Sequence, residues 1–287
     1  MKYLKILNWN ILSPHLIEYD TNFFPKKYYS KTTTSKNSRL KLFIKLLNQH
    51  IDTSKPNLIS FQEVPSIWYV EIFSILREYG YDSIHTTYGS DTREMGIVLA
   101  WKSHYVLENI EIQKVGDLIP QKSYKDSKSQ KKDREYAIGK LNKIIFVSLR
   151  YGSKKMLFGS YHMPCSFKYP FVMHLHAYAI TSYVDKLSKK YHNNIILTTD
   201  LNAKPESETF RIMSKKLQTV TTKPTTYVVR KDSLSGKFVE FNEIIDYVWV
   251  KKDSYTLSNQ IVLSDNIISP NSQNSSDHFP ILMKLKI

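Results

Sequence analysis

The chain of 287 residues is long enough for one large globular domain, and its hydrophobic fraction of 41% suits an ordinary core. A single cysteine, Cys165, excludes an intrachain disulfide and a cysteine-based zinc cluster. No apolar run approaches the roughly 20 residues that a transmembrane helix needs, and the sequence begins without a signal-peptide pattern. We therefore expect an intracellular protein, cytoplasmic or nuclear.

The charge balance favours a polyanionic partner. There are 41 Lys and Arg residues against 26 Asp and Glu residues, a formal net charge of +15. Such an excess attracts nucleic acid, nucleotides or an anionic membrane surface. A lysine-rich surface also serves solubility alone, so the charge favours nucleic acid without establishing it. The sequence does not indicate an oligomeric state.

Apolar runs with strand character recur along the whole chain. In chain order we expect strands at Tyr3–Trp9, Leu58–Gln62, Gly96–Trp101, Ile144–Arg150, Lys155–Tyr161, Asn194–Thr199, Ile244–Val250 and Pro280–Lys286. Helical periodicity, first-turn prolines and a terminating glycine predict helices over Ser38–Ile51, from Pro65 to Gly80, over Pro170–Tyr191 and over Pro205–Leu217. No linker rich in Pro, Gly or Ser separates two cores, so we expect a single domain over residues 1–287.

Two segments have the composition of surface insertions. Ser13–Asn37 mixes aromatic and basic side chains, a mix that holds backbone phosphates and stacks on bases. Within it we choose Lys26 and Lys27 as candidate substrate-binding residues, together with Asn8 just before it. The segment Gln121–Glu135 is strongly polar, and we expect it to be a mobile solvated loop.

Polar residues stand at or beside the ends of several predicted strands, and strand ends gather at a rim when sheets pack. These residues are Asn8 and Asn10, Gln62 and Glu63, His162, Asp200 and Asn202, Asp246, and Asp277 and His278. Phosphodiester cleavage needs this inventory. A hard cation takes carboxylate ligands, a carboxylate orients a water nucleophile, and amide and imidazole groups hydrogen-bond the charged transition state.

Six motifs occur in order: N-W-N-I-L (8–12), F-Q-E-V (61–64), S-Y-H-M-P (160–164), T-D-L-N-A-K-P-E-S (199–207), I-D-Y-V-W (245–249) and S-D-H-F-P (276–280). This ordered set resembles the endonuclease/exonuclease/phosphatase superfamily, also called DNase I-like, over nearly the whole chain. The resemblance implies a two-sheet α/β sandwich with helices on its outer faces, forming one catalytic domain. It also implies a Mg²⁺ cofactor, with Mn²⁺ as a substitute.

The resemblance implies a role for each matching residue. Glu63 becomes the main metal ligand, assisted by Asn10 and Asp277. Asp200 becomes the carboxylate that orients or deprotonates the attacking water, and Asn202 steadies the water or the phosphate. His278, held by Asp246, and His162 contact the phosphate.

The local sequence points to one branch of the superfamily. The D-x-N-x-x-P-x-S run from Asp200 and the N-I-L run from Asn10 are similar to the branch of deadenylases, nocturnin and 2′-phosphodiesterases. We therefore expect a nuclease that prefers RNA to DNA, of the 3′-exoribonuclease type. The alternative is a phosphatase or phosphodiesterase for nucleotides, inositol phosphates or phospholipid headgroups. Ranked lower are a DNA-repair endonuclease or tyrosyl-DNA phosphodiesterase, and lowest an inactive nucleic-acid-binding module.

The sequence departs from the family pattern at two positions. Thr199 replaces the usual glycine before Asp200, and Leu12 replaces the acidic residue of the abasic-site endonucleases, which argues against that activity. Each site residue also has a plain structural interpretation. Asn10 alone is a turn cap, Glu63 a helix-start carboxylate, and Asp200 an Asx-turn residue.

Some further residues have a structural interpretation only. We expect His174 and His176 to be packing or surface residues and Cys165 to be buried and inert. The four tryptophans, Trp9, Trp68, Trp101 and Trp249, should belong to the core.

Overall fold

The computed structural model describes residues 3–19, 29, 35–90, 94–121, 127–191, 194–220, 223–231, 235–252, 254–263 and 267–286. Lys26 and Lys27 lie outside these residues. The chain divides into two compact units. Unit 1 comprises Met1–Ser103, Thr221–Ile245 and Ser258–Ile287, and unit 2 comprises His104–Val220 and Asp246–Leu257. Each unit contains one six-stranded sheet, and that both belong to one catalytic domain stays a prediction.

The sheet of unit 1 has the strand order β13-β14-β1-β2-β4-β3. The strands are β1 (Tyr3–Asn10), β2 (Leu58–Gln62), β3 (Tyr81–Tyr88), β4 (Met95–Lys102), β13 (Thr256–Val262) and β14 (Ile281–Lys286). Because β1 and β2 are parallel, both end at the same edge of the sheet, with Asn10 opposite Gln62. Since β14 is antiparallel to β1, the residues that lead into β14 arrive at that same edge.

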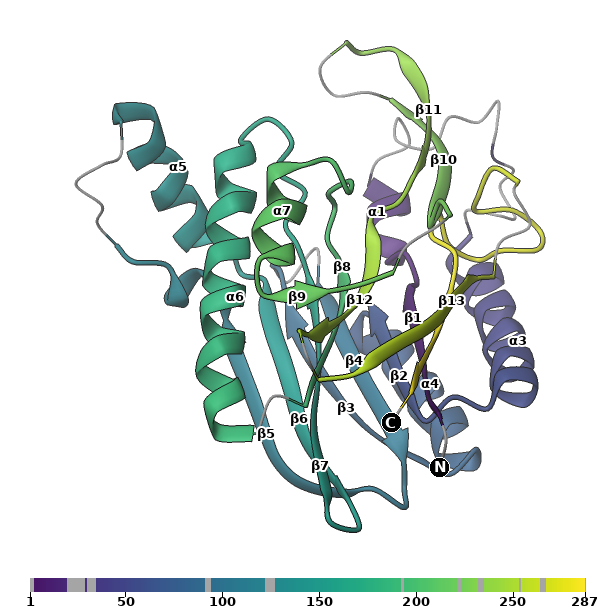
Figure 1. The fold of residues 1–287 in the computed structure, drawn as a ribbon. Helices are drawn as coiled ribbons and strands as arrows, with labels where there is room; N and C mark the ends of the chain where they lie inside the picture. Colours follow the sequence, from purple (N-terminus) through teal and green to yellow (C-terminus); the bar gives the residue numbers. More distant parts are fainter. Residues whose placement is uncertain are drawn as a thin grey trace. The chain divides into compact units, whose positions relative to one another are not determined.

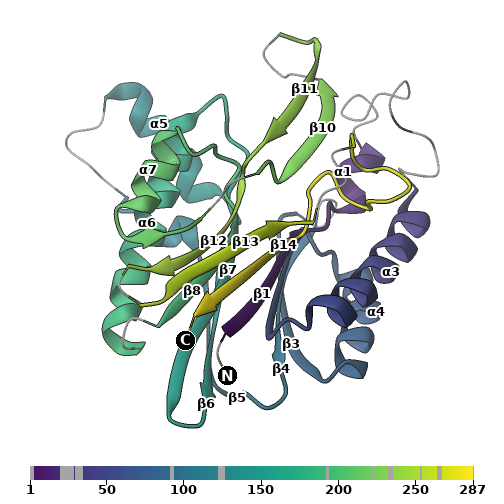
Figure 2. The same ribbon diagram turned by 45° about the vertical axis from the view of Figure 1, so that its right-hand side comes forward.

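The helices of unit 1 are α1 (Pro14–Tyr19), α3 (Lys36–Ser54) and α4 (Ser66–Glu78). Figure 2 shows α3 and α4 on one face of the sheet. The buried stripe of α3, which includes Phe43 and Leu47, packs with Trp9 of β1 and Phe61 of β2 in one apolar core. A hairpin of β10 (Thr226–Lys231) and β11 (Phe238–Glu243) extends beyond the sheet in both views (Figure 1).

The sheet of unit 2 has the strand order β5-β6-β7-β8-β12-β9. The strands are β5 (Val106–Lys114), β6 (Lys143–Tyr151), β7 (Lys154–His162), β8 (Ile195–Asp200), β9 (Leu217–Gln218) and β12 (Asp246–Lys251). β7 and β8 run parallel, and β12 runs antiparallel to β8. This register places the last residues of β7 and β8 beside the first residue of β12.

The helical elements of unit 2 are η2 (Val115–Leu118, a 3₁₀ turn), α5 (Lys128–Gly139), α6 (Pro170–Tyr191) and α7 (Glu208–Ser214). α6 packs against β7 and β8 and contacts both α5 and α7; Figure 1 shows these two helices on either side of it. α7 begins after Ser207, whose hydroxyl accepts the backbone N–H of Phe210 at 3.2 Å.

Most of the expected elements are confirmed. Each of the eight predicted strands overlaps an observed one, and the helix over Pro170–Tyr191 has the predicted bounds. The four tryptophans are buried, as expected. None of the helices in the described part of the chain is long and apolar enough to cross a bilayer.

Two expectations were wrong. Much of Gln121–Glu135 is helical, because Ser127 and Gln130 form a reciprocal capping box that starts α5. Cys165, in the connection from β7 to α6, is exposed rather than buried.

Candidate functional site

Glu63 follows β2 directly and has an unusual backbone conformation. Its φ of 62° lies in the left-handed region, which is disfavoured for residues other than glycine. The residue is only 5% exposed, and both oxygens of its carboxylate accept hydrogen bonds. Asn10 Nδ2 donates to Oε1 at 2.9 Å, and the backbone N–H of Ser13 donates to Oε2 at 2.9 Å. These contacts aim the carboxylate along the edge where β1 and β2 end.

The residue after Glu63 is held from two directions. The N–H of Val64 donates to the carbonyl oxygen of Gly96 at 2.9 Å. The carbonyl oxygen of Val64 accepts a hydrogen bond from Nε2 of His85 at 3.0 Å. A Cβ atom on Gly96 would lie 2.1 Å from His85 Nε2 and 2.5 Å from Val64 O. The strained backbone at Glu63 therefore depends on a glycine and a histidine on neighbouring strands.

Asp277 and His278 arrive at this edge just before β14. Ser276 Oγ donates to the carbonyl oxygen of Asn10 at 2.7 Å and accepts the N–H of His278 at 3.1 Å. Trp9 Nε1 donates to the carbonyl oxygen of His278 at 3.0 Å. Thr226, the first residue of β10, donates through Oγ1 to the carbonyl oxygen of Asp277 at 2.7 Å. Unit 1 thus brings Asn10, Glu63, Asp277 and His278 into one hydrogen-bonded network.

A buried arginine lies beneath this network. Arg39 of α3 is only 1% exposed, and its guanidinium donates hydrogen bonds to three backbone carbonyl oxygens. Nε donates to Ser275 O at 2.8 Å and Nη2 to Ile11 O at 2.9 Å, with a second, shorter bond from Nη2 to Leu12 O. The acceptors belong to the segments that carry Asn10 and Asp277. A single side chain therefore holds both segments.

Unit 2 presents a row of three ionisable side chains across adjacent strands. His162, the last residue of β7, lies opposite Asp200, the last residue of β8. Asp246, the first residue of β12, lies opposite Asp200 on its other side. His162 Nε2 lies 3.4 Å from Asp200 Oδ2, and all three side chains are buried. Two carboxylates and an imidazole are thereby fixed on one end of this sheet.

Asn202 completes the group in unit 2. Its φ of 49° is left-handed, a conformation that asparagine tolerates. Its N–H donates to Asp200 Oδ1 at 2.9 Å, and its Nδ2 donates to the carbonyl oxygen of Met163 at 2.9 Å. The same Nδ2 lies 3.2 Å from His162 Nε2. The predicted Asx-turn is therefore present, and it positions the amide beside the imidazole.

The predicted substrate-binding residue Asn8 and the aromatic residue Tyr29 are both buried. Asn8 is fully buried, and its Oδ1 accepts Nε2 of Gln62 at 2.8 Å. Tyr29, from the basic and aromatic segment, is buried too: its hydroxyl accepts the N–H of Val229 at 2.8 Å and donates to the carbonyl oxygen of Val229 at 3.1 Å. Burial, with a smaller contribution from the Asp277 carboxylate, raises the pKa of Tyr29 well above its usual value. The Tyr29 side chain therefore packs against β10 instead of being exposed.

His174 and His176, for which the sequence suggests only a packing or surface role, both lie on α6 in unit 2. His176 is fully buried and donates through Nε2 to Ala137 O at 3.0 Å, while its Nδ1 accepts the hydroxyl of Tyr161 at 2.6 Å. Burial lowers the pKa of His176 to about 4. Burial also lowers the pKa of His174. Both imidazoles are therefore neutral near pH 7, which agrees with the structural interpretation of the sequence.

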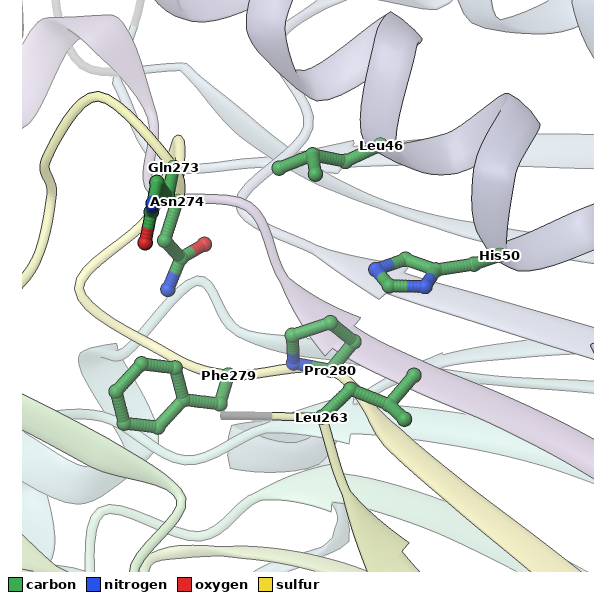
Figure 3. A pocket seen from close by; sticks show the side chains of 7 residues that line it. All are labelled: Leu46, His50, Leu263, Gln273, Asn274, Phe279 and Pro280. Carbon is green, nitrogen blue, oxygen red and sulfur yellow. The ribbon is translucent and has the colours of Figure 1, made fainter. Parts of the chain in front are cut away.

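A small pocket of about 90 Å³ adjoins the Asp277–His278 segment (Figure 3). It is lined by Leu46, His50, Leu263, Gln273, Asn274, Phe279 and Pro280. Asn274 Nδ2 donates to His278 O at 3.3 Å, so the pocket wall supports the segment from behind. Burial lowers the pKa of His50 to about 4, which leaves the pocket without a cationic group among its lining residues. This largely apolar hollow does not suit phosphate.

Arg39, His85 and Ser276 were not singled out from the sequence. Arg39 carried a signal, since it lies four residues before Phe43 and so falls on the apolar face of its helix. A charged residue in that position requires buried partners. His85 carried no comparable signal, because its contact is to a backbone atom distant in sequence. Ser276 stands in the S-D-H-F-P motif, which gave it no role of its own.

No protein-family model matches the chain, and no curated protein sequence matches it. Solved structures do match. ANGEL2, described as a 2′,3′-cyclic phosphatase and solved with adenosine-2′,3′-vanadate, gives a TM-score of 0.76 at 12% identity, over 100% of this chain and 96% of that chain. The human Nocturnin catalytic domain, solved with a sulfate anion, gives a TM-score of 0.69 at 14% identity, over 99% and 94% of the two chains.

An endonuclease/exonuclease/phosphatase family protein from Bacteroides thetaiotaomicron gives a TM-score of 0.66 at 15% identity, over 99% of this chain and 97% of that chain. At these identities the likenesses show the fold. The expected fold class, an α/β fold of the DNase I-like type with two sheets and helices, is confirmed. These structures therefore share the fold that the resemblance implies, and membership of the superfamily and of its branch stays a prediction.

Proposed function

We propose that the chain is a divalent-metal-dependent phosphoric ester hydrolase that cleaves nucleic acid, as a 3′-exoribonuclease of the deadenylase type. The observation that carries the proposal is the row of His162, Asp200 and Asp246 across three adjacent strands of unit 2. The resemblance makes Asp200 the carboxylate that orients or deprotonates the water, His162 a phosphate-contacting group, and Asp246 the carboxylate that holds His278. A structural role alone does not account for two buried carboxylates beside an imidazole at one sheet end.

The residues of unit 1 suit a hard cation. Glu63 offers a carboxylate whose orientation is fixed by hydrogen bonds from Asn10 and Ser13, and Asp277 offers a second carboxylate in the same network. Mg²⁺ prefers a few such oxygen ligands and retains waters. When bound, the cation would neutralise the phosphate oxygens. Mg²⁺, with Mn²⁺ as a substitute, therefore fits the donor atoms.

The chain's own side chains supply the remaining chemistry. Asp200 orients the attacking water or accepts its proton, and its geometry is maintained by the Asn202 N–H. The Asn202 amide and His162 donate hydrogen bonds to phosphate oxygens as charge builds on them. His278 takes the second phosphate-contacting role. Its pairing with Asp246, which the resemblance implies, joins residues of different units and stays a prediction.

The substrate class is supported by charge and by the fold comparisons. The formal charge of +15 favours a polyanion. The ANGEL2 structure contains an adenosine-2′,3′-vanadate, a compound related to RNA termini, and this supports RNA over DNA for a chain of the same fold. A cytoplasmic or nuclear site of action follows from that substrate.

The direct test is cleavage of end-labelled RNA and DNA oligonucleotides, including an oligo(A) tail, with Mg²⁺ or Mn²⁺. EDTA and the variant Asp200→Ala serve as controls. We expect metal-dependent shortening of RNA from its 3′ end, absent in Asp200→Ala. If both polymers stay intact while a small phosphoester is hydrolysed, the nuclease assignment is wrong.

A small phosphoester is the second candidate substrate. It is favoured by the description of ANGEL2 as a 2′,3′-cyclic phosphatase. Salt dependence separates the two candidates, because binding of a polyanion weakens steeply as salt rises. If the KM of the hydrolysed substrate is the same at low and high salt, the small phosphoester is supported. If that KM rises steeply with salt, the polymer is supported.

A further inference from the structure

An exposed aromatic and basic surface on unit 2 is formed by residues that have no role in the proposed chemistry. It is formed by Lys132, Tyr136 and Lys140 of α5 and its C-terminal cap, with Lys168 and Tyr169 of the β7–α6 connection, and we call it the tyrosine platform. Tyr136 is 48% exposed and Tyr169 is 49% exposed. Their ring centroids are 5.7 Å apart at an interplanar angle of 73°. The two rings therefore form one contiguous aromatic surface.

The platform combines rings with cations. Lys132, Tyr136 and Lys140 are spaced four residues apart and so share one face of α5. Lys140 Nζ lies 4.0 Å from the centroid of the Tyr136 ring and donates to its hydroxyl at 2.7 Å. α5 and its cap carry five basic residues against two acidic ones. Exposed rings among lysines are the arrangement that binds single strands, with bases on the rings and phosphates on the cations.

The platform is attached on two sides to His162. The connection that carries Lys168 and Tyr169 begins directly after His162. On the other side, Asn142 follows Lys140 by two residues and donates through Nδ2 to His162 O at 2.9 Å. A strand of nucleic acid with one phosphate at His162 would therefore reach the platform within a few nucleotides.

We propose that the tyrosine platform binds single-stranded nucleic acid, with bases stacked on Tyr136 and Tyr169 and phosphates contacting Lys132, Lys140 and Lys168. Its position along the substrate rests on the proposed function, whereas binding itself does not. Stacking accepts every base, so the platform lengthens the bound segment without reading sequence. The consequence is a preference for substrates longer than a dinucleotide.

Binding is measured first, without cleavage. Fluorescent twelve-residue RNA and DNA oligonucleotides are titrated with the protein in EDTA, and anisotropy gives Kd. We expect the double variant Tyr136→Ala/Tyr169→Ala to raise Kd about fivefold or more for either sugar. The matched control is Tyr178→Ala, because Tyr178 is also 48% exposed in unit 2 and has Lys215 Nζ 5.9 Å from its ring centroid. The control should leave Kd within about twofold.

Cleavage assays distinguish substrate binding at the tyrosine platform from the chemical step. The double variant should raise KM for the twelve-residue substrate by a similar factor and leave turnover of a dinucleotide unchanged. An unchanged Kd and KM for the long substrate overturn the platform. If nothing is cleaved by the parent protein while Kd still rises in the double variant, the platform is upheld and the proposed hydrolase is wrong. If Lys140→Gln alone weakens binding and the tyrosine variant does not, bases do not stack there and the proposal fails.

Discussion

Asp246 lies directly opposite Asp200 in the antiparallel pair of β12 and β8, and both carboxylates are buried. Asp200 ends its strand, whereas Asp246 begins its own, so both side chains are fixed at one end of the sheet. Burying two carboxylates opposite each other costs free energy unless a cation or a shared proton compensates their charges. The predictions below start from this pair.

The first prediction concerns the two carboxylates. Asp200→Asn keeps an oxygen for the Asn202 N–H but removes the base, so we expect single-turnover cleavage to fall by about 10²- to 10⁴-fold. Asp246→Asn should cost less, about 10- to 100-fold, because the resemblance gives it a supporting role. Urea unfolding should show both variants folded. Retention of about a tenth or more of the activity in Asp200→Asn would remove it from the mechanism.

The second prediction tests the backbone at Glu63. Gly96→Ala places a Cβ 2.1 Å from His85 Nε2 and 2.8 Å from Thr86 O, so the strand ends beside Glu63 must move. We expect a loss of about 1–3 kcal/mol in the free energy of unfolding and a weaker affinity for Mn²⁺ by calorimetric titration. Gly139→Ala is the matched control, since a Cβ there meets nothing within 4 Å. Equal behaviour of the two variants would contradict the dependence on Gly96.

The third prediction concerns the buried guanidinium of Arg39. Arg39→Met leaves the carbonyl oxygens of Ile11, Leu12 and Ser275 without their donor, and we expect a loss of about 3 kcal/mol or more in unfolding free energy. Arg39→Lys should recover little, because an ammonium lacks the planar fork that reaches separate acceptors. Lys41→Met, exposed on the same helix, is the control and should change stability by less than about 0.5 kcal/mol.

The fourth prediction is a pH dependence of stability. Burial, with a smaller contribution from the Lys140 ammonium, lowers the pKa of His176 to about 4, below its usual 6.5. Between these values the unfolded chain binds a proton that the folded chain does not, so stability is full above about pH 6.5 and falls toward pH 4. The loss approaches about 3 kcal/mol at the acid end.

Urea unfolding at several pH values checks this, with His176→Gln as the variant. The variant should be less stable at pH 8, because Tyr161 and Ala137 lose their imidazole partner, yet show a shallower decline on acidification. His50 contributes a similar term, since burial lowers its pKa to about 4 as well. An identical decline in the parent and His176→Gln would show that His176 does not titrate in this way.

The sequence predicted the buried strands well because their apolar runs are long and their chemistry-bearing residues stand at the ends. It missed β3, β5, β9, β10, β11 and β13, and most residues of β5 and β11 are exposed. An edge strand or a free hairpin has no continuous buried face, so the apolar pattern is weak there. The sequence also missed α5, because its polar composition suggested a loop although a capping box starts a helix there.

The sequence predicted the ionisable side chains of the candidate site and missed the residues that hold them in place. Asp200, Asp246 and His162 were named from motifs at strand ends. The hydrogen bond from His85 to Val64 O joins a side chain to a backbone atom 21 residues away, and no local pattern encodes that contact. The segment Ser13–Asn37 was expected to contact substrate from its composition, which does not reveal that an aromatic side chain such as Tyr29 is buried.

The position of β14 in the sheet has a consequence for synthesis on the ribosome. β1 and β2 are made early, yet β1 pairs on its other side with Ile281–Lys286, more than 270 residues later. Until those residues emerge, one edge of β1 has no partner strand. The hydrogen bond from Ser276 to the carbonyl oxygen of Asn10 cannot yet form. The nascent chain therefore has an aggregation-prone edge and lacks one of the proposed metal ligands, Asp277, until the segment that leads into β14 has been made. The proposed activity should appear only after β14 has emerged.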